Sequence, residues 1–225
     1  MLMRKLSGPA ANEDLTLLHE DACLLVFDKP SGLLSVPGRG PDKQDCASLR
    51  AQAVYADARV VHRLDMATSG LFVMARGAQA QSALSKAFAV GKIAKHYVAV
   101  VAGKLDTQSD AVDGWSMIDL PIAADWPRRP LRIIDHQTGK PSITRWRILS
   151  LDASTTRILL NPLTGRTHQL RVHLQALGHP ILGDALYAPP DIQSLATRLL
   201  LHASRIEFSH PATGAPLTFS STPPF

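Results

Sequence analysis

Hydrophobic residues occur along this chain mainly in short runs, a pattern that is typical of strands rather than of long helices. Runs of apolar or β-branched residues, bounded by Gly, Pro, Asp or Ser, predict strands at 24–27, 60–61, 71–75, 95–101, 143–149, 156–160, 199–203, 205–208 and 217–220. In the strand at 95–101, Tyr97 and Ala99 share a face because side chains alternate along a strand.

Three segments carry helix signals. Asp45 suits the N-cap of a helix that reaches about residue 58. Residues 78–90 are rich in Ala and end before Gly91, and residues 167–177 carry an apolar stripe and end before Gly178.

Strands outnumber helices, and short links join neighbouring strands, which predicts an α+β fold with a mixed, largely antiparallel central sheet flanked by helices and loops. Residues 1–13 are polar and contain Gly8 and Pro9, so we expect a flexible N-terminal tail. Residues 103–140 are expected to be mostly loop. With no internal repeat or linker in view, residues 14–225 are predicted to form one domain.

The composition of the 225 residues is globular, with 45% hydrophobic and 19% charged residues. The longest apolar runs fall well short of the roughly 20 residues that cross a bilayer, and no secretory signal precedes them, so we expect a cytoplasmic protein without membrane contact. The net charge of +5 permits an acidic partner such as nucleic acid without requiring one. Because aromatic residues make up only 5%, any base stacking would rest on one or two placed rings.

The sequence lacks the glycine-rich phosphate cradles, the H-E-x-x-H and C-x-x-C metal patterns, and the G-x-S-x-G serine elbow. The two cysteines, Cys23 and Cys46, do not have metal-ligand spacing. We therefore expect chemistry without a cofactor or a metal.

The segment 62–71 places a charged pair between two apolar strands. Arg63 and Asp65 face the same way along an extended backbone. One interpretation is a carboxylate exposed at a strand end and kept ionised by a cation. The alternative is an Asp that caps a turn beside a surface Arg.

The segment 164–173 is basic around a predicted helix start. Arg166 opposes the helix dipole there, which favours a carboxylate or phosphate partner, although solvated basic residues on an amphipathic helix are the alternative. Arg171 and His173 are expected on the polar side of the helix, where phosphate contact is available.

Two further features have alternative interpretations. Tyr97 is either a core residue or a ring that stacks on a substrate base. The stiff basic loop with Arg128 and Arg129 either binds RNA or is a solvent-exposed connection between strands.

Four sequence motifs, at 28–38, 62–71, 164–184 and 199–203, resemble those of the RluA-type pseudouridine synthases in residues, order and spacing. The resemblance covers nearly the whole chain and is closest to the bacterial dual-specificity members, which act on large-subunit (23S-type) ribosomal RNA and on transfer RNA. Many relatives carry an N-terminal S4-type RNA-binding domain. Only about 23 residues precede the first motif here, so no S4 domain is expected.

The resemblance implies an isomerase that converts uridine in RNA stem-loops to pseudouridine without a cofactor. By this resemblance Asp65 matches the catalytic aspartate, Arg166 its basic partner, and Tyr97 the tyrosine that stacks on the target base. Arg63 matches the arginine that helps to displace the nucleotide, and Leu200 matches a contact of the base pocket. His62, Arg128, Arg129 and Arg171 are the further candidates for substrate binding.

Two rival functions differ from this one in the residues that they require. A carboxylate-dependent glycosidase or nucleosidase needs a second acid near Asp65, for which the motifs offer only Asp184, a residue better interpreted as a turn cap. A non-catalytic RNA-binding module would have no need for Asp65, Tyr97 and Arg166 together. A monomer is the default expectation.

Overall fold

The computed structural model describes residues 4–8, 14–106 and 112–225. The chain divides into two compact units, which are described in turn: a first unit of residues 1–95 and 203–224, and a second unit of residues 96–202 with Phe225. None of the helices in the described part of the chain has both the length and the apolar character needed to cross a bilayer.

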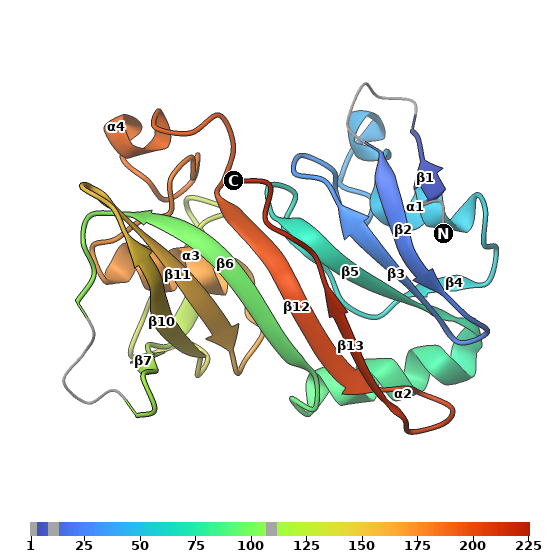
Figure 1. Cartoon of the computed structure of the whole chain (residues 1–225). Coiled ribbons are helices and arrows are strands. Elements are labelled where there is room, and N and C mark those ends of the chain that lie inside the picture. Colours follow the sequence, from blue (N-terminus) through green and yellow to red (C-terminus); the bar gives the residue numbers. More distant parts are fainter. Residues whose placement is uncertain (1–3, 9–13, 107–111) are drawn as a thin grey trace. The chain divides into compact units, whose positions relative to one another are not determined.

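The first unit is an antiparallel sheet with two α-helices and one short 3-10 helix (Figure 1). Its strand order is β1-β2-β3-β5-β12, with β4 on β5 and β13 on β12. The strands are β1 (Arg4–Leu6), β2 (Leu15–Glu20), β3 (Leu24–Lys29), β4 (Ala58–Val60), β5 (Ser69–Arg76), β12 (Leu201–Ser209) and β13 (Pro216–Ser220). The helices are the 3-10 helix η1 (Pro41–Lys43), α1 (Ala47–Gln52) and α2 (Gly77–Ala89), and α2 packs on β4 and β5.

β3 and β5 form the centre of this unit. Residues 24–27 and 72–75 have no exposed surface, because both faces of these strands are covered. Such strands are continuous apolar runs rather than alternating ones, which is why both were predictable. Gly70 allows the close approach of β12, because a Cβ there would lie 2.3 Å from the backbone oxygen of Ala203.

The second unit contains a sheet in the order β6-β11-β10-β7 and a separate hairpin of β8 and β9. Its strands are β6 (Ala94–Ala102), β7 (Ser116–Asp119), β8 (Ile122–Ala124), β9 (Arg132–Ile134), β10 (Ile143–Leu151) and β11 (Thr155–Pro162). Helix α3 (Gln169–Ala176) lies behind β10 and β11 in Figure 1 and packs on β9, and the short α4 (Pro190–Gln193) follows it.

The α+β class and the antiparallel pairing are confirmed, and the predicted strands at 24–27, 71–75 and 95–101 correspond to β3, β5 and β6. The predicted helix at 45–58 is wrong in extent. α1 ends at Gln52, and its N-cap is Cys46. Asp45 does not cap it, because its carboxylate binds the Arg50 guanidinium at 2.7 and 2.8 Å.

Two predicted irregular segments contain strands. Within the predicted tail, residues 4–6 form β1 on β2, while residues 1–3 and 9–13 lie outside the described residues. The interval 103–140 contains β7, β8 and β9, and its residues 107–111 are likewise outside the described part. These strands have only three or four residues, too few for a clear periodicity.

The polar side predicted for α3 is wrong, because Arg171 and His173 are both buried. The Arg171 guanidinium forms two hydrogen bonds, of 2.6 and 2.8 Å, with the carboxylate of Asp184. Asp184 also accepts the N–H groups of Leu186 and Tyr187, which confirms its expected role in a turn. A buried guanidinium with a carboxylate partner is part of the packing. The prediction that Arg171 faces solvent, where it could contact phosphate, is therefore wrong.

Arg171→Met is expected to lower the free energy of unfolding by roughly 3–5 kcal/mol, because it leaves the Asp184 carboxylate buried without its counter-charge. The matched control is Arg205→Met, which removes an exposed pair with Glu207 and should cost less than about 1 kcal/mol. Urea unfolding of both variants checks this. Equal stability of the two would contradict the buried role of Arg171.

Candidate active site

Asp65 lies in the segment between β4 and β5, in a turn closed by the Thr68 N–H, which donates to the Asp65 carbonyl at 3.1 Å. The Asp65 side chain is half-buried, and Arg63 is exposed. The carboxylate therefore precedes a buried strand, and its backbone belongs to a defined turn. A half-buried carboxylate in a turn beside an exposed arginine is compatible with both interpretations of the segment, so the catalytic role of Asp65 stays a prediction.

Residues 31–35, from the first sequence motif, fasten the backbone on both sides of Asp65. The Ser35 hydroxyl accepts the Leu64 N–H at 3.0 Å and donates to the Leu64 carbonyl at 2.8 Å. The Gly32 N–H donates to the Met66 carbonyl at 2.8 Å. The Ser31 hydroxyl donates to the Ala67 carbonyl at 2.6 Å. Residues 64, 66 and 67 are thus all held, which leaves the Asp65 backbone little freedom.

Lys29 is a residue of this region that the sequence reasoning missed. Its side chain is fully buried, and its ammonium donates to the carbonyls of Pro30, Leu33 and Met66 at 2.8, 2.7 and 3.2 Å. The three carbonyls match the three hydrogens of an ammonium group. Through Lys29, the backbone of the first motif at Pro30 and Leu33 is linked to Met66, the residue that follows Asp65. Its position directly after a buried apolar run was the available signal.

His62 has a structural partner. The Val73 N–H donates to its Nε2 at 2.9 Å, and its ring stacks on Phe88 with centroids 4.5 Å apart. Burial, and secondarily the charge of Lys95, lowers the pKa of His62 to about 3. The ring is therefore neutral at pH 7, with its proton on Nδ1. It ties the start of the Asp65 segment to β5, and its role in substrate binding stays a prediction.

In the second unit, Tyr97 is a residue of β6, and Leu200 is hydrogen-bonded to the same strand. Tyr97 is half-buried on β6 and pairs in register with Leu160 of β11. The Leu200 carbonyl accepts the Val100 N–H at 3.2 Å, and the Leu200 N–H donates to the Leu182 carbonyl at 3.0 Å. The motif around 182 and the motif around 200 thus meet at the same strand that carries Tyr97.

Arg166 is exposed and lies three residues before α3, because this helix begins at Gln169 rather than at the predicted residue 167. The buried Gln169 holds this turn, because its Oε1 accepts the Arg166 N–H at 3.0 Å and the Thr164 hydroxyl at 2.8 Å. The Gln169 amide nitrogen donates to Ile143 and Thr144 of β10, each at 3.0 Å. Gln169 is a second positioning residue that sequence reasoning missed, since its partners on β10 lie 25 and 26 residues away.

The remaining candidates lie in the loop between β8 and β9. Arg128 donates to the Asp125 carboxylate at 2.7 Å while its side chain stays 71% exposed, and Arg129 stacks on Trp126. Asp65, Arg63 and His62 thus belong to the first unit, and the other candidates to the second. The pairing of Asp65 with Arg166 and Tyr97 stays a prediction.

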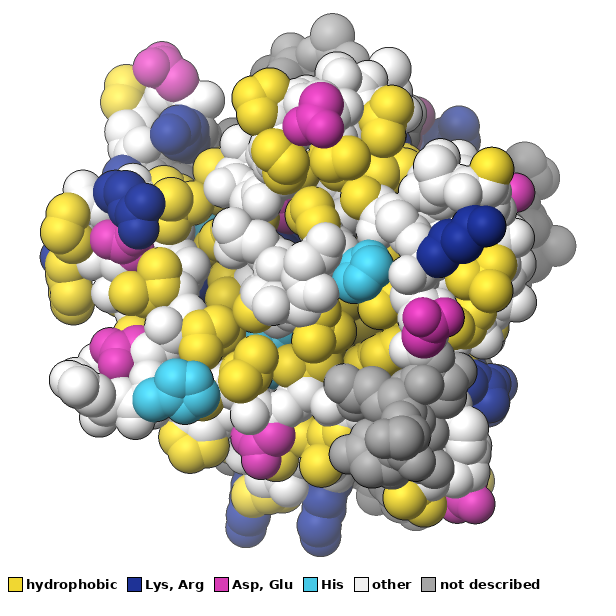
Figure 2. All heavy atoms as spheres, turned by 90° about the vertical axis from the view of Figure 1, so that its left-hand side faces the viewer, with side chains coloured by type: hydrophobic (Ala, Val, Ile, Leu, Met, Phe, Trp, Pro, Cys, Tyr) yellow, Lys and Arg dark blue, Asp and Glu magenta, His cyan; other side chains and the backbone are white. Residues whose placement is uncertain are grey.

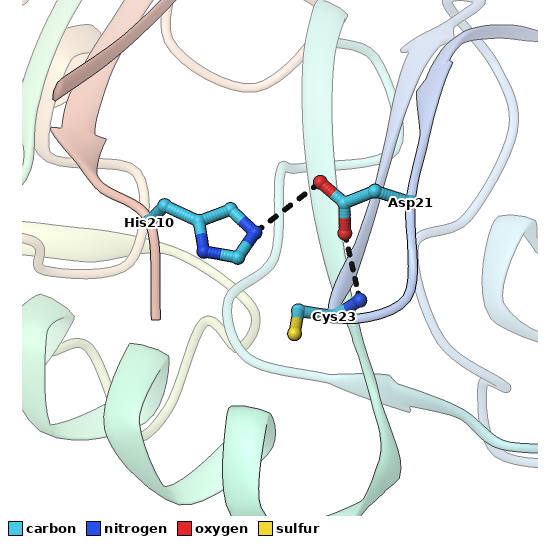
Figure 3. A group of neighbouring side chains, drawn as sticks. All are labelled: Asp21, Cys23 and His210. Atoms are coloured by element: carbon cyan, nitrogen blue, oxygen red, sulfur yellow. Dashed lines mark hydrogen bonds and ion pairs between the residues drawn. The ribbon is translucent and has the colours of Figure 1, made fainter. Parts of the chain in front are cut away.

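Asp21, Cys23 and His210 form the one group of three potential metal ligands in the described ranges (Figure 3). The Asp21 carboxylate accepts the N–H of Cys23 and also lies 3.4 Å from Nε2 of His210. Nδ1 of His210 accepts the N–H groups of Ala212 and Thr213. A neutral ring then carries its proton on Nε2, the atom that would bind the metal. The arrangement therefore fits a hydrogen bond to Asp21 better than a metal ion.

The stability of the protein should fall as the pH drops from about 6.5 toward 3. The unfolded chain binds a proton at His62 over this range, whereas the folded chain does not, so acid favours unfolding. In His62→Gln this contribution disappears, and the pH dependence should flatten by up to roughly 1.4 kcal/mol per pH unit. Denaturant unfolding between pH 4 and 7 measures both slopes, and identical slopes would contradict a His62 ring that stays neutral in the folded protein.

The model of the family described as RNA pseudouridylate synthase matches residues 23–176, which include the Asp65 segment, Tyr97 and Arg166. The dual-specificity RNA pseudouridine synthase RluA of Escherichia coli K12 is 45% identical over 97% of both chains. The same-named enzyme of Pasteurella multocida is 43% identical over 96% of this chain and 97% of its own.

Among solved structures, the fold is similar to human RNA pseudouridylate synthase domain containing 1, with a TM-score of 0.77 and 26% identity over 97% of this chain and 87% of the other. The family match and the identity over nearly full length lead to one conclusion. The chain belongs to the RluA-type RNA pseudouridine synthases, isomerases that act on RNA.

Proposed function

We propose that this synthase modifies uridines in stem-loops of large-subunit ribosomal RNA, of transfer RNA or of both. The observation that carries the proposal is the 45% identity, over 97% of each chain, to an enzyme named for dual specificity. The sequence motifs shared with the dual-specificity members support the same two RNA classes. We further propose that the enzyme acts as a monomer in the cytoplasm.

The reaction breaks the N1–C1′ bond of the uridine and forms a C5–C1′ bond. C5 loses a proton and N1 gains one, so there is no net oxidation, and the overall change needs no co-reactant. A single anionic group is needed, either to attack C1′, to add to C6 or to remove a proton from C2′. Asp65 is the proposed group, and all three roles need its carboxylate ionised and held still. The hydrogen bonds of Ser31, Gly32 and Ser35 to its neighbours support that assignment.

Arg166 is proposed to keep the Asp65 carboxylate ionised through a charge-assisted hydrogen bond. Tyr97 and Leu200 would hold the detached uracil while it turns and would keep water from the sugar. Arg63 would help to displace the target nucleotide, since a stacked base must first be flipped out, at a cost of a few kcal/mol. The exposure of Arg63 and Arg166 supports roles toward a bound RNA.

The glycosidase alternative requires a second acidic residue that can reach the substrate, and Asp184 does not meet this requirement. Asp184, the companion that the motifs offered, is fully buried and bonded to Arg171 and two N–H groups. It is therefore not available to protonate a leaving group or to activate water.

Basic side chains on the face shown in Figure 2 lie scattered, singly or in pairs, among hydrophobic and acidic ones. RNA affinity from this face would then come from individual phosphate contacts rather than from one broad basic patch. Independently of this view, the exposed arginines Arg128 and Arg129 are proposed as individual phosphate contacts.

Asp65→Asn should abolish pseudouridine formation and leave RNA affinity nearly unchanged, because it removes the reacting oxygen and no phosphate contact. The purified protein is incubated with unmodified ribosomal and transfer RNA transcripts, and pseudouridine is mapped by primer extension after carbodiimide treatment. The matched control is Asp191→Asn, which changes an exposed residue of α4.

Activity of Asp65→Asn within about tenfold of the wild type would remove Asp65 from its proposed role. Wild-type protein that binds both transcripts and modifies neither would favour the non-catalytic RNA-binding module. Release of free uracil would favour a glycosidase.

A further inference from the structure

The loop of residues 125–131, between β8 and β9, carries an exposed tryptophan among exposed arginines. Trp126 is 66% exposed, whereas Trp146 is 1% exposed and Trp115 is half-buried. Arg128 and Arg129 follow it closely in the sequence, and together with Asp125 they leave the loop one net positive charge. An indole has a large apolar surface, and leaving most of it in water gives the folded protein no stability. An exposed ring of this kind is typical of a binding surface.

Arg129 covers part of the ring of Trp126. Its guanidinium carbon lies 3.5 Å from the ring centroid, the distance of two stacked planar groups. Most of the indole surface remains exposed beyond this contact. A nucleobase is the planar ligand that could extend such a stack, and its phosphate would meet the arginine charges. An aliphatic protein side chain would use neither the flat surface nor the charge.

The 125–131 loop is held in shape by its own hydrogen bonds. The Asp125 N–H donates to the Leu131 carbonyl at 3.1 Å, and the Leu131 N–H donates to the Arg128 carbonyl at 3.0 Å. The nearly buried Asp125 carboxylate accepts the Arg128 N–H at 3.3 Å and its Nε at 2.7 Å. A loop that is already ordered loses little entropy when a ligand binds, which favours a binding role.

The base of the loop is tied to the turn that carries Arg166. The Arg132 N–H, at the start of β9, donates to the Tyr187 hydroxyl at 2.9 Å. That hydroxyl lies 2.7 Å from Nδ1 of His168, two residues after Arg166. Tyr187 also packs with Val172 of α3 in a buried cluster. Trp126 and Arg166 thus belong to one connected part of the second unit, as expected if one RNA contacts both.

We propose that Trp126, stacked on Arg129, binds one unpaired nucleobase of the RNA substrate. The inference rests on the proposed function of this loop in RNA contact and names the group that the loop recognises. Stacking on an indole is tolerant of base identity, so the site would sense an unstacked base at a fixed place rather than a sequence. It would favour loops that present a second accessible base beside the target.

Binding is measured in an Asp65→Asn background, so that no turnover is involved. The probe is a labelled stem-loop from unmodified transfer RNA or large-subunit ribosomal RNA, whichever this protein binds more tightly. Trp126→Ala should weaken binding about ten- to hundredfold, and Trp126→Phe should restore part of the loss. The matched control is Leu151→Ala, which truncates another exposed apolar side chain and should leave the affinity within about twofold.

The same stem-loop is then made with one abasic nucleotide at a time in its loop. At one position Trp126→Ala should cause no further loss, because the stacked base is already missing, while at the others its full effect should remain. An equal loss of affinity at every position would show that Trp126 only supports the fold of the loop. If Trp126→Ala does not weaken binding of the intact stem-loop, the ring does not contact this RNA. Either result overturns the proposal.

Salt dependence separates stacking from phosphate contact. Arg128→Ala should lower the slope of log affinity against log salt concentration by about one, whereas Trp126→Ala should leave the slope unchanged. A lowered slope in Trp126→Ala would contradict stacking. A wild-type protein that forms no pseudouridine would overturn the proposed function without affecting these binding results, so the two failures are distinguishable.

Discussion

The structure around the candidate catalytic aspartate depends on a buried ammonium group and the backbone it organises. The side chain of Lys29 has no exposed surface, and a buried charge of this kind costs several kcal/mol unless hydrogen bonds replace its water. The carbonyls of Pro30, Leu33 and Met66 do so. Because Met66 follows Asp65 directly, the condition that makes the buried charge tolerable also fixes the turn that carries the carboxylate. Ser31, Gly32 and Ser35 complete this restraint.

The second unit uses the same principle with neutral groups. Gln169 has both amide atoms occupied, and through them it holds the Arg166 turn against β10. His173 lies between Leu120 and Thr144, and burial lowers its pKa, so it stays a neutral part of the packing. Arg166, which we propose as the partner of the Asp65 carboxylate, would be positioned more precisely because the groups that hold its backbone do not titrate near pH 7. The exposed side chains are then the ones left for RNA.

The sequence predicted well what depends on local pattern. The buried strands β3 and β5 are continuous apolar runs, and α2 follows from an Ala-rich segment that ends near Gly91. It failed where a partner distant in sequence decides. Arg171 was expected in solvent because the apolar stripe of α3 left it on the polar side, yet Asp184 makes its burial possible. The role of Lys29 was missed for the same reason, since one of its carbonyl partners lies 37 residues away. The resemblance to a family identified the candidate residues, and the structure shows what holds several of them.

We propose that the Asp65 carboxylate acts from a fixed position set by residues 29–35. The most direct test is the pseudouridine-forming activity of Asp65→Glu, which keeps the charge and moves the carboxylate outward by one methylene. With the backbone held on both sides, we expect a loss of at least about a hundredfold, since misplacement by about 1 Å costs an enzyme roughly that much. Activity within about tenfold of the wild type would mean that the segment adjusts freely, and would contradict the account.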